Sequence, residues 1–157
     1  MAESFSLTQS EQAGRLQIIV RGMVNEKAEF PKIPPVPELY IDLEKVEGLN
    51  STGTRNWCFW VRQIPSPTQI YLEKCPILFV KAFNQISGAL PSNASVQSFF
   101  VPFIADESGE RKDILFVRDE NFSDSSSLQI PVVFDSGGKL MEMDVLQQSY
   151  FEFLKRK

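Results

Sequence analysis

The sequence contains no histidine among its 157 residues. Without an imidazole group, the chain has no histidine general base, no Ser-His-Asp triad and no histidine metal ligand. It also lacks a phosphate-cradling glycine-rich loop and the spacing of an EF-hand calcium site. We therefore expect a protein that is not an enzyme and that carries no cofactor.

Cysteines, long apolar runs and clustered positive charges are also scarce. Cys58 and Cys75 lie in apolar segments, which predicts small buried side chains in a reduced, cytoplasmic protein. No stretch of 18 apolar residues occurs, so we expect no membrane span. The net charge is −4. Lysines and arginines are dispersed except at the C-terminal end, which argues against a nucleic-acid ligand.

A hydrophobic content of 43% is enough for one core, so we expect residues 1–157 to form a single domain. Residues 1–14 are polar and lack the basic region and apolar core of a secretory signal, which predicts a flexible lead-in.

Apolar patterns then alternate between strand and helix periodicity. They predict strands at 16–24, 39–43, 69–72 and 94–103, and helices at 51–63, 76–90 and 145–154. In the last helix, we expect Leu146, Tyr150, Phe153 and Leu154 to face inward. This alternation predicts an α/β fold in which helices flank a short, mostly parallel β-sheet.

A polar tetrapeptide at 50–53 separates the strand expected at 39–43 from the helix expected at 51–63. It places the Ser51 hydroxyl at a helix N-terminus, where free N–H groups and the helix dipole favour an anion. Ser51 is therefore a candidate phosphate acceptor, phosphate-binding group or helix cap. Arg55, one turn further on, could neutralise a phosphate, contact a partner or lie in solvent.

This region resembles the signature of STAS domains, the anti-sigma-factor-antagonist family. The resemblance is carried by Ile41-Asp42-Leu43, Val46, Leu49-Asn50-Ser51-Thr52-Gly53 and Trp57. In the bacterial regulatory members, Asp-Ser-Ser/Thr-Gly opens the first long helix, and a partner kinase phosphorylates the first serine. Asn50 occupies the position of the aspartate and lacks its negative charge. Ser51 aligns with the phosphorylated serine.

The resemblance implies a bacterial signalling module with a STAS-like sheet whose first strand is antiparallel. Its partner would be a protein, such as an anti-sigma-type serine kinase, and its modified form would carry phosphoserine at Ser51. Thr52 and Gly53 would complete the motif.

The second half is similar to a bacterial STAS subgroup in which a zinc ribbon precedes the C-terminal helix. On this alignment the ribbon covers 104–138, and its ligand positions hold Ala105, Ser108, Val133 and Ser136. None of these side chains offers a thiolate or imidazole, so the resemblance implies a degenerate, metal-free β-ribbon. We expect the apolar residues at 132–134 and 113–117 to supply its small core instead.

Aromatic residues widen the apolar surface of the helix expected at 51–63. Trp57 suits the core-facing side, whereas Phe59 and Trp60 extend beyond a single stripe. These two side chains either pack on the sheet and the proline-rich connector or anchor a protein interface, where tryptophan is enriched.

Three functions remain open at this stage. The first is a non-enzymatic signalling module that binds a protein partner and is switched at Ser51. The second is a nucleotide or small-ligand sensor that uses the same helix terminus. The third is an architectural subunit that assembles through the aromatic helix face.

Overall fold

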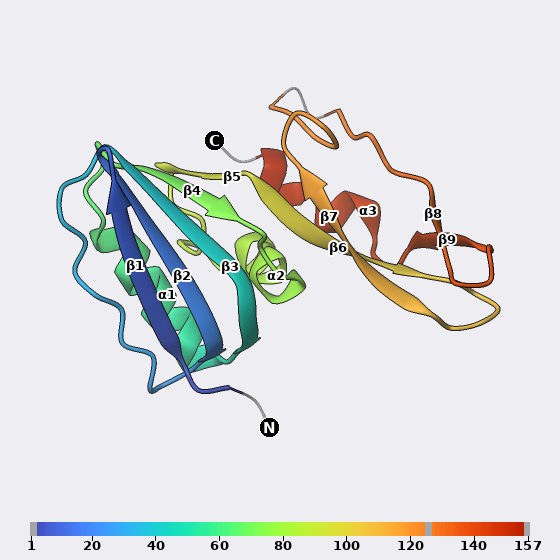
Figure 1. Cartoon of the computed structure of the whole chain (residues 1–157), viewed down its shortest axis with the longest axis horizontal. Coiled ribbons are helices and arrows are strands. Elements are labelled where there is room, and N and C mark those ends of the chain that lie inside the picture. The colour runs from blue at the N-terminus through green and yellow to red at the C-terminus, as the bar shows by residue number, and fades with distance from the viewer. Residues whose placement is uncertain (1–2, 125–126, 156–157) are drawn as a thin grey trace.

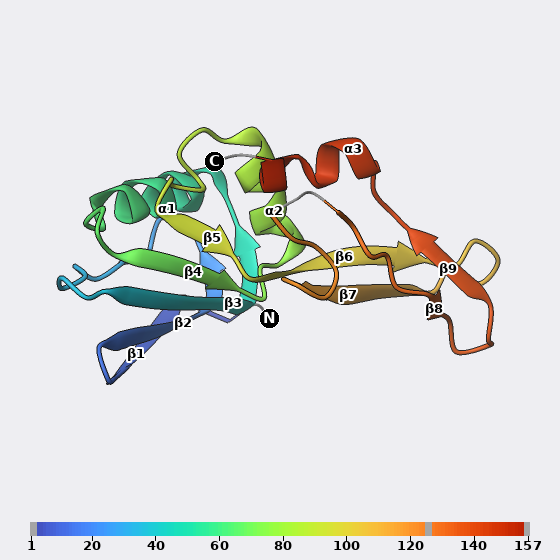
Figure 2. The same ribbon diagram turned by 90° about the horizontal axis from the view of Figure 1, so that it is seen from above.

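The computed structural model describes residues 3–124 and 127–155, which form two β-sheets side by side (Figure 1). Seen from above, the helices lie along one side of both sheets (Figure 2). The elements in chain order are β1 Ser6–Gln12, β2 Arg15–Val24, β3 Glu38–Leu49, α1 Ser51–Gln63, β4 Gln69–Glu73, α2 Ile77–Gln85, β5 Ala94–Val96, β6 Ser98–Ile104, β7 Arg111–Val117, β8 Val133–Phe134, β9 Leu140–Met143, α3 Gln147–Tyr150 and the 3-10 helix η1 Glu152–Lys155.

The first sheet has the strand order β1-β2-β3-β4-β5. The pairs β2–β3, β3–β4 and β4–β5 are parallel, and only β1 is antiparallel to its neighbour. Alternate residues of the central strands, such as Ile18, Ile41 and Leu72, are fully buried. This period of two turns one face of the sheet toward α1 and α2. The predicted α/β fold with a mostly parallel sheet is confirmed.

The second sheet is antiparallel, with the order β7-β6-β9-β8. A single residue, Gln97, separates β5 from β6, so the chain passes directly from one sheet into the other. Phenylalanine rings fill the core between this sheet and the C-terminal helices, with Phe99 in contact with Phe116, Phe122 and Phe153. This core is continuous with that of the first sheet, because Phe153 contacts both Phe99 of β6 and Phe83 of α2.

The expected flexible lead-in at 1–14 is wrong, because Ser6–Gln12 forms β1. Its antiparallel pairing with β2 is closed by a tight turn at Ala13 and Gly14, whose φ angles are 50° and 80°. Two such left-handed residues are typical of a type I′ hairpin. An edge strand exposes most of its side chains, so β1 lacks the apolar alternation that would have revealed it. The antiparallel strand is β1, and the strand predicted at 16–24 is parallel to β3.

Both helices predicted in the second part of the chain are shorter than expected. The one predicted at 76–90 ends at Gln85, which leaves Ile86 40% exposed. The one predicted at 145–154 is divided into α3 and η1, and Leu146 is 81% exposed at the start of α3, so its expected inward position is wrong. By contrast, α1 has the predicted bounds.

None of the helices in the described part of the chain is long and apolar enough to cross a membrane.

Candidate functional site

The N-terminus of α1 is capped by Asn50, not by Ser51. The Asn50 Oδ1 accepts a hydrogen bond of 2.8 Å from the Gly53 N–H, which satisfies one of the free amides of the first turn. The Asn50 amide donates to Glu26 Oε2 at 3.1 Å. A bond from the backbone N–H of Glu26 and then this amide bond lower the pKa of Glu26. Asn50 thus joins α1 to the segment after β2.

Gly53 brings α1 against the end of β2. A Cβ placed on Gly53 would lie 1.9 Å from the Val24 carbonyl oxygen and 2.8 Å from the Asn25 nitrogen. Only a residue without a side chain fits such a close approach of two backbone segments. Gly53 therefore has a packing role, and the adjacent Thr52 is half-buried.

Ser51 occupies the first turn of α1, directly after the carboxyl end of β3. Its side chain is exposed, and its hydroxyl makes no hydrogen bond with any residue in the described ranges. No acidic residue occupies the first turn of α1. Arg55 is also exposed, and both side chains line the same groove.

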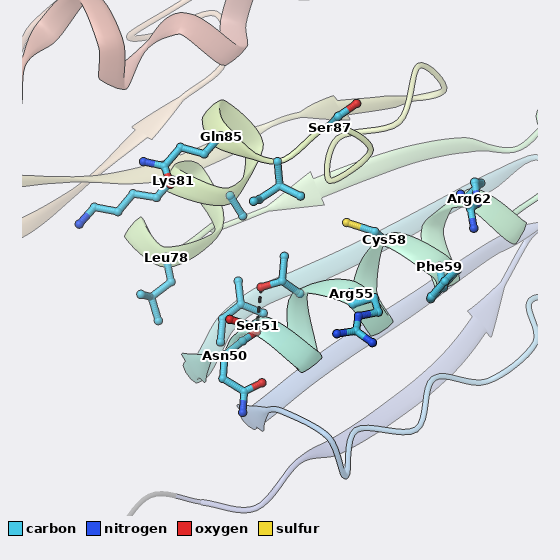
Figure 3. A pocket seen from close by; sticks show the side chains of 14 residues that line it. Asn50, Ser51, Arg55, Cys58, Phe59, Arg62, Leu78, Lys81, Gln85 and Ser87 are labelled. Carbon is cyan, nitrogen blue, oxygen red and sulfur yellow. Dashed lines mark hydrogen bonds between the residues drawn. The ribbon is translucent and has the colours of Figure 1, made fainter.

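This groove runs between α1 and α2 and has a volume of about 540 Å³ (Figure 3). We call it the α1–α2 groove. Its lining residues are Leu49, Asn50, Ser51, Thr54, Arg55, Cys58, Phe59, Arg62, Leu78, Lys81, Ala82, Gln85, Ile86 and Ser87. Ten of these fourteen residues are exposed, so the site is an open surface groove.

All the charges that line the α1–α2 groove are positive. They come from Arg55 and Arg62 of α1 and Lys81 of α2. None of the three makes an ion pair with a residue that the structure describes. The whole protein has a net charge of −4, so the groove has the opposite sign to the molecule that carries it.

Apolar side chains lie exposed between these cations. Phe59 is 47% exposed, and Leu78 and Ile86 are each 40% exposed. The Arg62 guanidinium lies over the Phe59 ring, 4.9 Å from its centroid, which holds the ring at the surface. The groove therefore combines apolar contact area with a positive rim.

Trp60 does not belong to this surface. It is 5% exposed, its indole N–H donates to the Pro31 carbonyl at 2.7 Å, and its ring stacks on Phe30 at 4.6 Å. The interpretation of Trp60 as an exposed anchor is wrong, because the proline-rich connector covers it. Its neighbour Phe59 is 47% exposed and lines the groove.

Neither cysteine has the environment of a reactive thiolate. Burial raises the pKa of the half-buried Cys58, with Arg62 opposing the shift, and it also raises the pKa of the fully buried Cys75. A raised pKa keeps each thiol protonated and weakly nucleophilic at neutral pH. Cys58 adds apolar area to the groove floor.

Three of the four positions aligned with zinc ligands lie in or next to two turns that are joined to each other, and the fourth, Val133, lies in β8. Ser108 Oγ donates to Asp135 Oδ2 at 3.0 Å, and Ser136 donates to Glu110 Oε1 from its hydroxyl at 2.7 Å and from its amide at 3.0 Å. We call these contacts the serine–carboxylate latch. Within residues 3–124 and 127–155, no three histidine, cysteine, aspartate or glutamate side chains are grouped to hold a metal ion.

The apolar core that we expected at 113–117 and 132–134 is centred on Phe116, which is fully buried, and not on 132–134. Val132 is 71% exposed and Phe134 52% exposed, so these residues do not form a core; Val133 is half-buried, and Ala105 is buried. The Ser136 hydroxyl lowers the pKa of Glu110, and the Lys139 amide, followed by the Ser108 hydroxyl, lowers the pKa of Asp135. Both carboxylates therefore act as charged acceptors.

A second groove of about 660 Å³ lies between α2 and α3 and shares Lys81 and Gln85 with the first. It is the larger of the two, but Asp144 and Glu152 oppose Lys81 there. We take the α1–α2 groove as the candidate site, because it unites Ser51, Arg55 and Phe59 with charges of one sign.

Sequence reasoning missed the contribution of α2 to this site. The sequence alone could have identified Arg62 as a site residue, because Arg55, Phe59 and Arg62 recur at helical spacing on one face of α1. Leu78 and Lys81 carry no such local signal and join the site only through the packing of α2 beside α1.

Comparison of the chain with models of known protein families, with curated proteins and with solved structures finds no match.

Proposed function

We propose that this chain is a non-enzymatic module that binds a protein partner in the α1–α2 groove. The observation that carries the proposal is the exposure of Phe59, Leu78 and Ile86 among three cations that make no ion pair with a described residue. Exposed apolar area with a polar rim is typical of interaction surfaces, and aromatic and arginine side chains are enriched in binding hot spots.

The module is further proposed to be a STAS-type signalling domain that is switched at Ser51. Support comes from the succession of β3, the Asn50 cap and an exposed serine in the first turn of α1. A phosphate on Ser51 would add about −1.5 to −2 charges to the rim. It would offset the Arg55 charge and weaken an electrostatic attraction for the partner. The unmodified form would then be the binding form.

Two other functions fit the groove less well. A small-ligand pocket buries about 70–90% of its ligand, whereas most residues lining this groove are exposed. An architectural role through an aromatic helix face would need Trp60 at the surface, and Trp60 is buried.

A photo-crosslinking residue at position 59 tests the proposal. We expect it to capture a specific protein in cells of the source organism. The same residue at Leu140, which is 61% exposed on the second sheet, is the matched control. If both positions capture the same proteins, or position 59 captures none, the groove is not the binding surface.

Variants at Ser51 test the switch separately. Ser51→Asp should weaken the crosslink and Ser51→Ala should preserve it, while both proteins stay folded. A carboxylate is tolerated at a helix N-terminus, so loss of folding is not the expected cause. If both variants crosslink as the wild type does, the groove remains the contact surface and the proposed switch is wrong.

A further inference from the structure

We infer that the segment of the partner that enters the α1–α2 groove is an acidic amphipathic α-helix. This inference rests on the proposed function and adds the chemistry of the partner. It combines the positive charge of the groove, the arrangement of the two helices that form it and the place where its positive surface ends.

Charge gives the first argument. Arg55, Arg62 and Lys81 face the groove with no acidic side chain among the fourteen lining residues. Elsewhere the described cations are often paired, as in Arg15–Glu38, Arg111–Asp144 and Arg118–Asp124. Complementary potentials guide binding and exclude wrong partners, so three cations that form no ion pair within the described residues favour a segment rich in aspartate and glutamate.

The arrangement of the two helices gives the second argument. Because α1 and α2 each follow a strand of the same parallel sheet, both helices lie on one face of it, and the groove lies between them (Figure 3). The 13 residues of α1 span roughly 20 Å. A groove of this kind accepts a helix whose apolar residues recur at i, i+3 or i+4, and i+7. Phe59, Leu78 and Ile86 offer contacts for such a stripe.

The boundary of the positive surface gives the third argument. Beyond Lys81 and Gln85 the surface continues into the α2–α3 groove, where Asp144 and Glu152 appear. Asp144 and Glu152 form ion pairs with Arg111 and Lys155, and the lining of the α2–α3 groove adds no cation beyond Lys81, so an acidic segment that extended further would meet no additional positive charge there. The acidic helix should therefore end at α2 and not continue across α3.

Selection from a random peptide library tests the inference with the full-length protein as bait. The peptides should be about 16 residues long, which is roughly four helical turns. We expect the enriched peptides to carry an excess of aspartate and glutamate and to place apolar residues at helical spacing. Their binding should fall at least about tenfold in the triple variant Arg55→Glu, Arg62→Glu, Lys81→Glu.

The matched control is the triple variant Lys27→Glu, Lys32→Glu, Lys45→Glu. It has the same net charge as the first, but its three exposed positions lie outside the groove. Selected peptides should bind it nearly as well as wild type. Circular dichroism of both variants verifies that each remains folded.

Several results would overturn the inference. The first is the selection of basic, uncharged or proline-rich peptides. The second is an equal loss of peptide binding in the two triple variants. The third is a selection in which the wild-type bait enriches no peptide more strongly than a Phe59→Asp bait does. Such results would leave the crosslink at position 59 intact if the partner docks by another chemistry. Failure of that crosslink would instead reject the groove itself.

Discussion

Replacing Gly53 with alanine tests the close packing of α1 on β2. Considered within the helix alone, the substitution is favourable, because glycine in a helix costs about 0.5–1 kcal/mol relative to alanine. The tertiary structure predicts the opposite sign. The new Cβ would lie 1.9 Å from the Val24 carbonyl oxygen and 2.4 Å from its carbonyl carbon.

The magnitude follows from which atoms must move. Overpacking a core costs about 1–3 kcal/mol when neighbouring side chains yield, and occasionally more. Here the neighbours are backbone atoms at the end of a strand in the central sheet, so no rotamer change relieves the contact. After subtraction of the helix-propensity gain, we expect Gly53→Ala to lower the free energy of unfolding by about 2 kcal/mol or more.

Urea unfolding followed by circular dichroism measures this difference. Arg55→Ala is the control, because its exposed side chain makes no ion pair in the described part of the chain, and it should stay within about 0.5 kcal/mol of wild type. A Gly53→Ala protein as stable as wild type, or more stable, would refute the packing role of Gly53.

Three further predictions concern the Asn50 cap, the serine–carboxylate latch and the four positions that we aligned with zinc ligands. Asn50→Ala should lower the free energy of unfolding by about 1 kcal/mol through loss of the cap, and Asn50→Asp should restore most of it; equal urea midpoints for all three proteins would contradict this. Folding lowers the pKa values of Glu110 and Asp135, so their contribution is complete above the unfolded values of about 4 and is lost as pH falls below them. Urea midpoints measured across this range should therefore fall less steeply in Glu110→Gln and Asp135→Asn, and wild-type slopes in both variants would exclude the latch. Elemental analysis of the purified protein should find far less than one zinc per chain, and a stoichiometric zinc would show that our alignment of the second half is wrong.

The sequence by itself determined the elements whose signals are local. The helix at 51–63 has the predicted bounds, because Asn50 caps it through a bond to an amide three residues away and Pro65 stands beyond its end. The buried strands β2, β3 and β4 were also predicted, although β3 extends further. Their apolar residues alternate with the pleat, and such a pattern needs no knowledge of distant partners.

Only the tertiary structure decided which of these elements form a site. The α1–α2 groove joins Arg55 to Lys81, 26 positions apart in the chain, because two parallel crossovers place both helices on one face of the sheet. Phe59 and Trp60 are adjacent aromatic residues, yet Phe59 is exposed and Trp60 is buried. The connector that covers Trp60 is far from it in sequence. The Glu110–Ser136 contact likewise joins two distant turns. Packing between segments far apart in the chain forms the groove, buries Trp60 and brings Glu110 to Ser136. A local sequence pattern does not show which distant segment packs against a given residue.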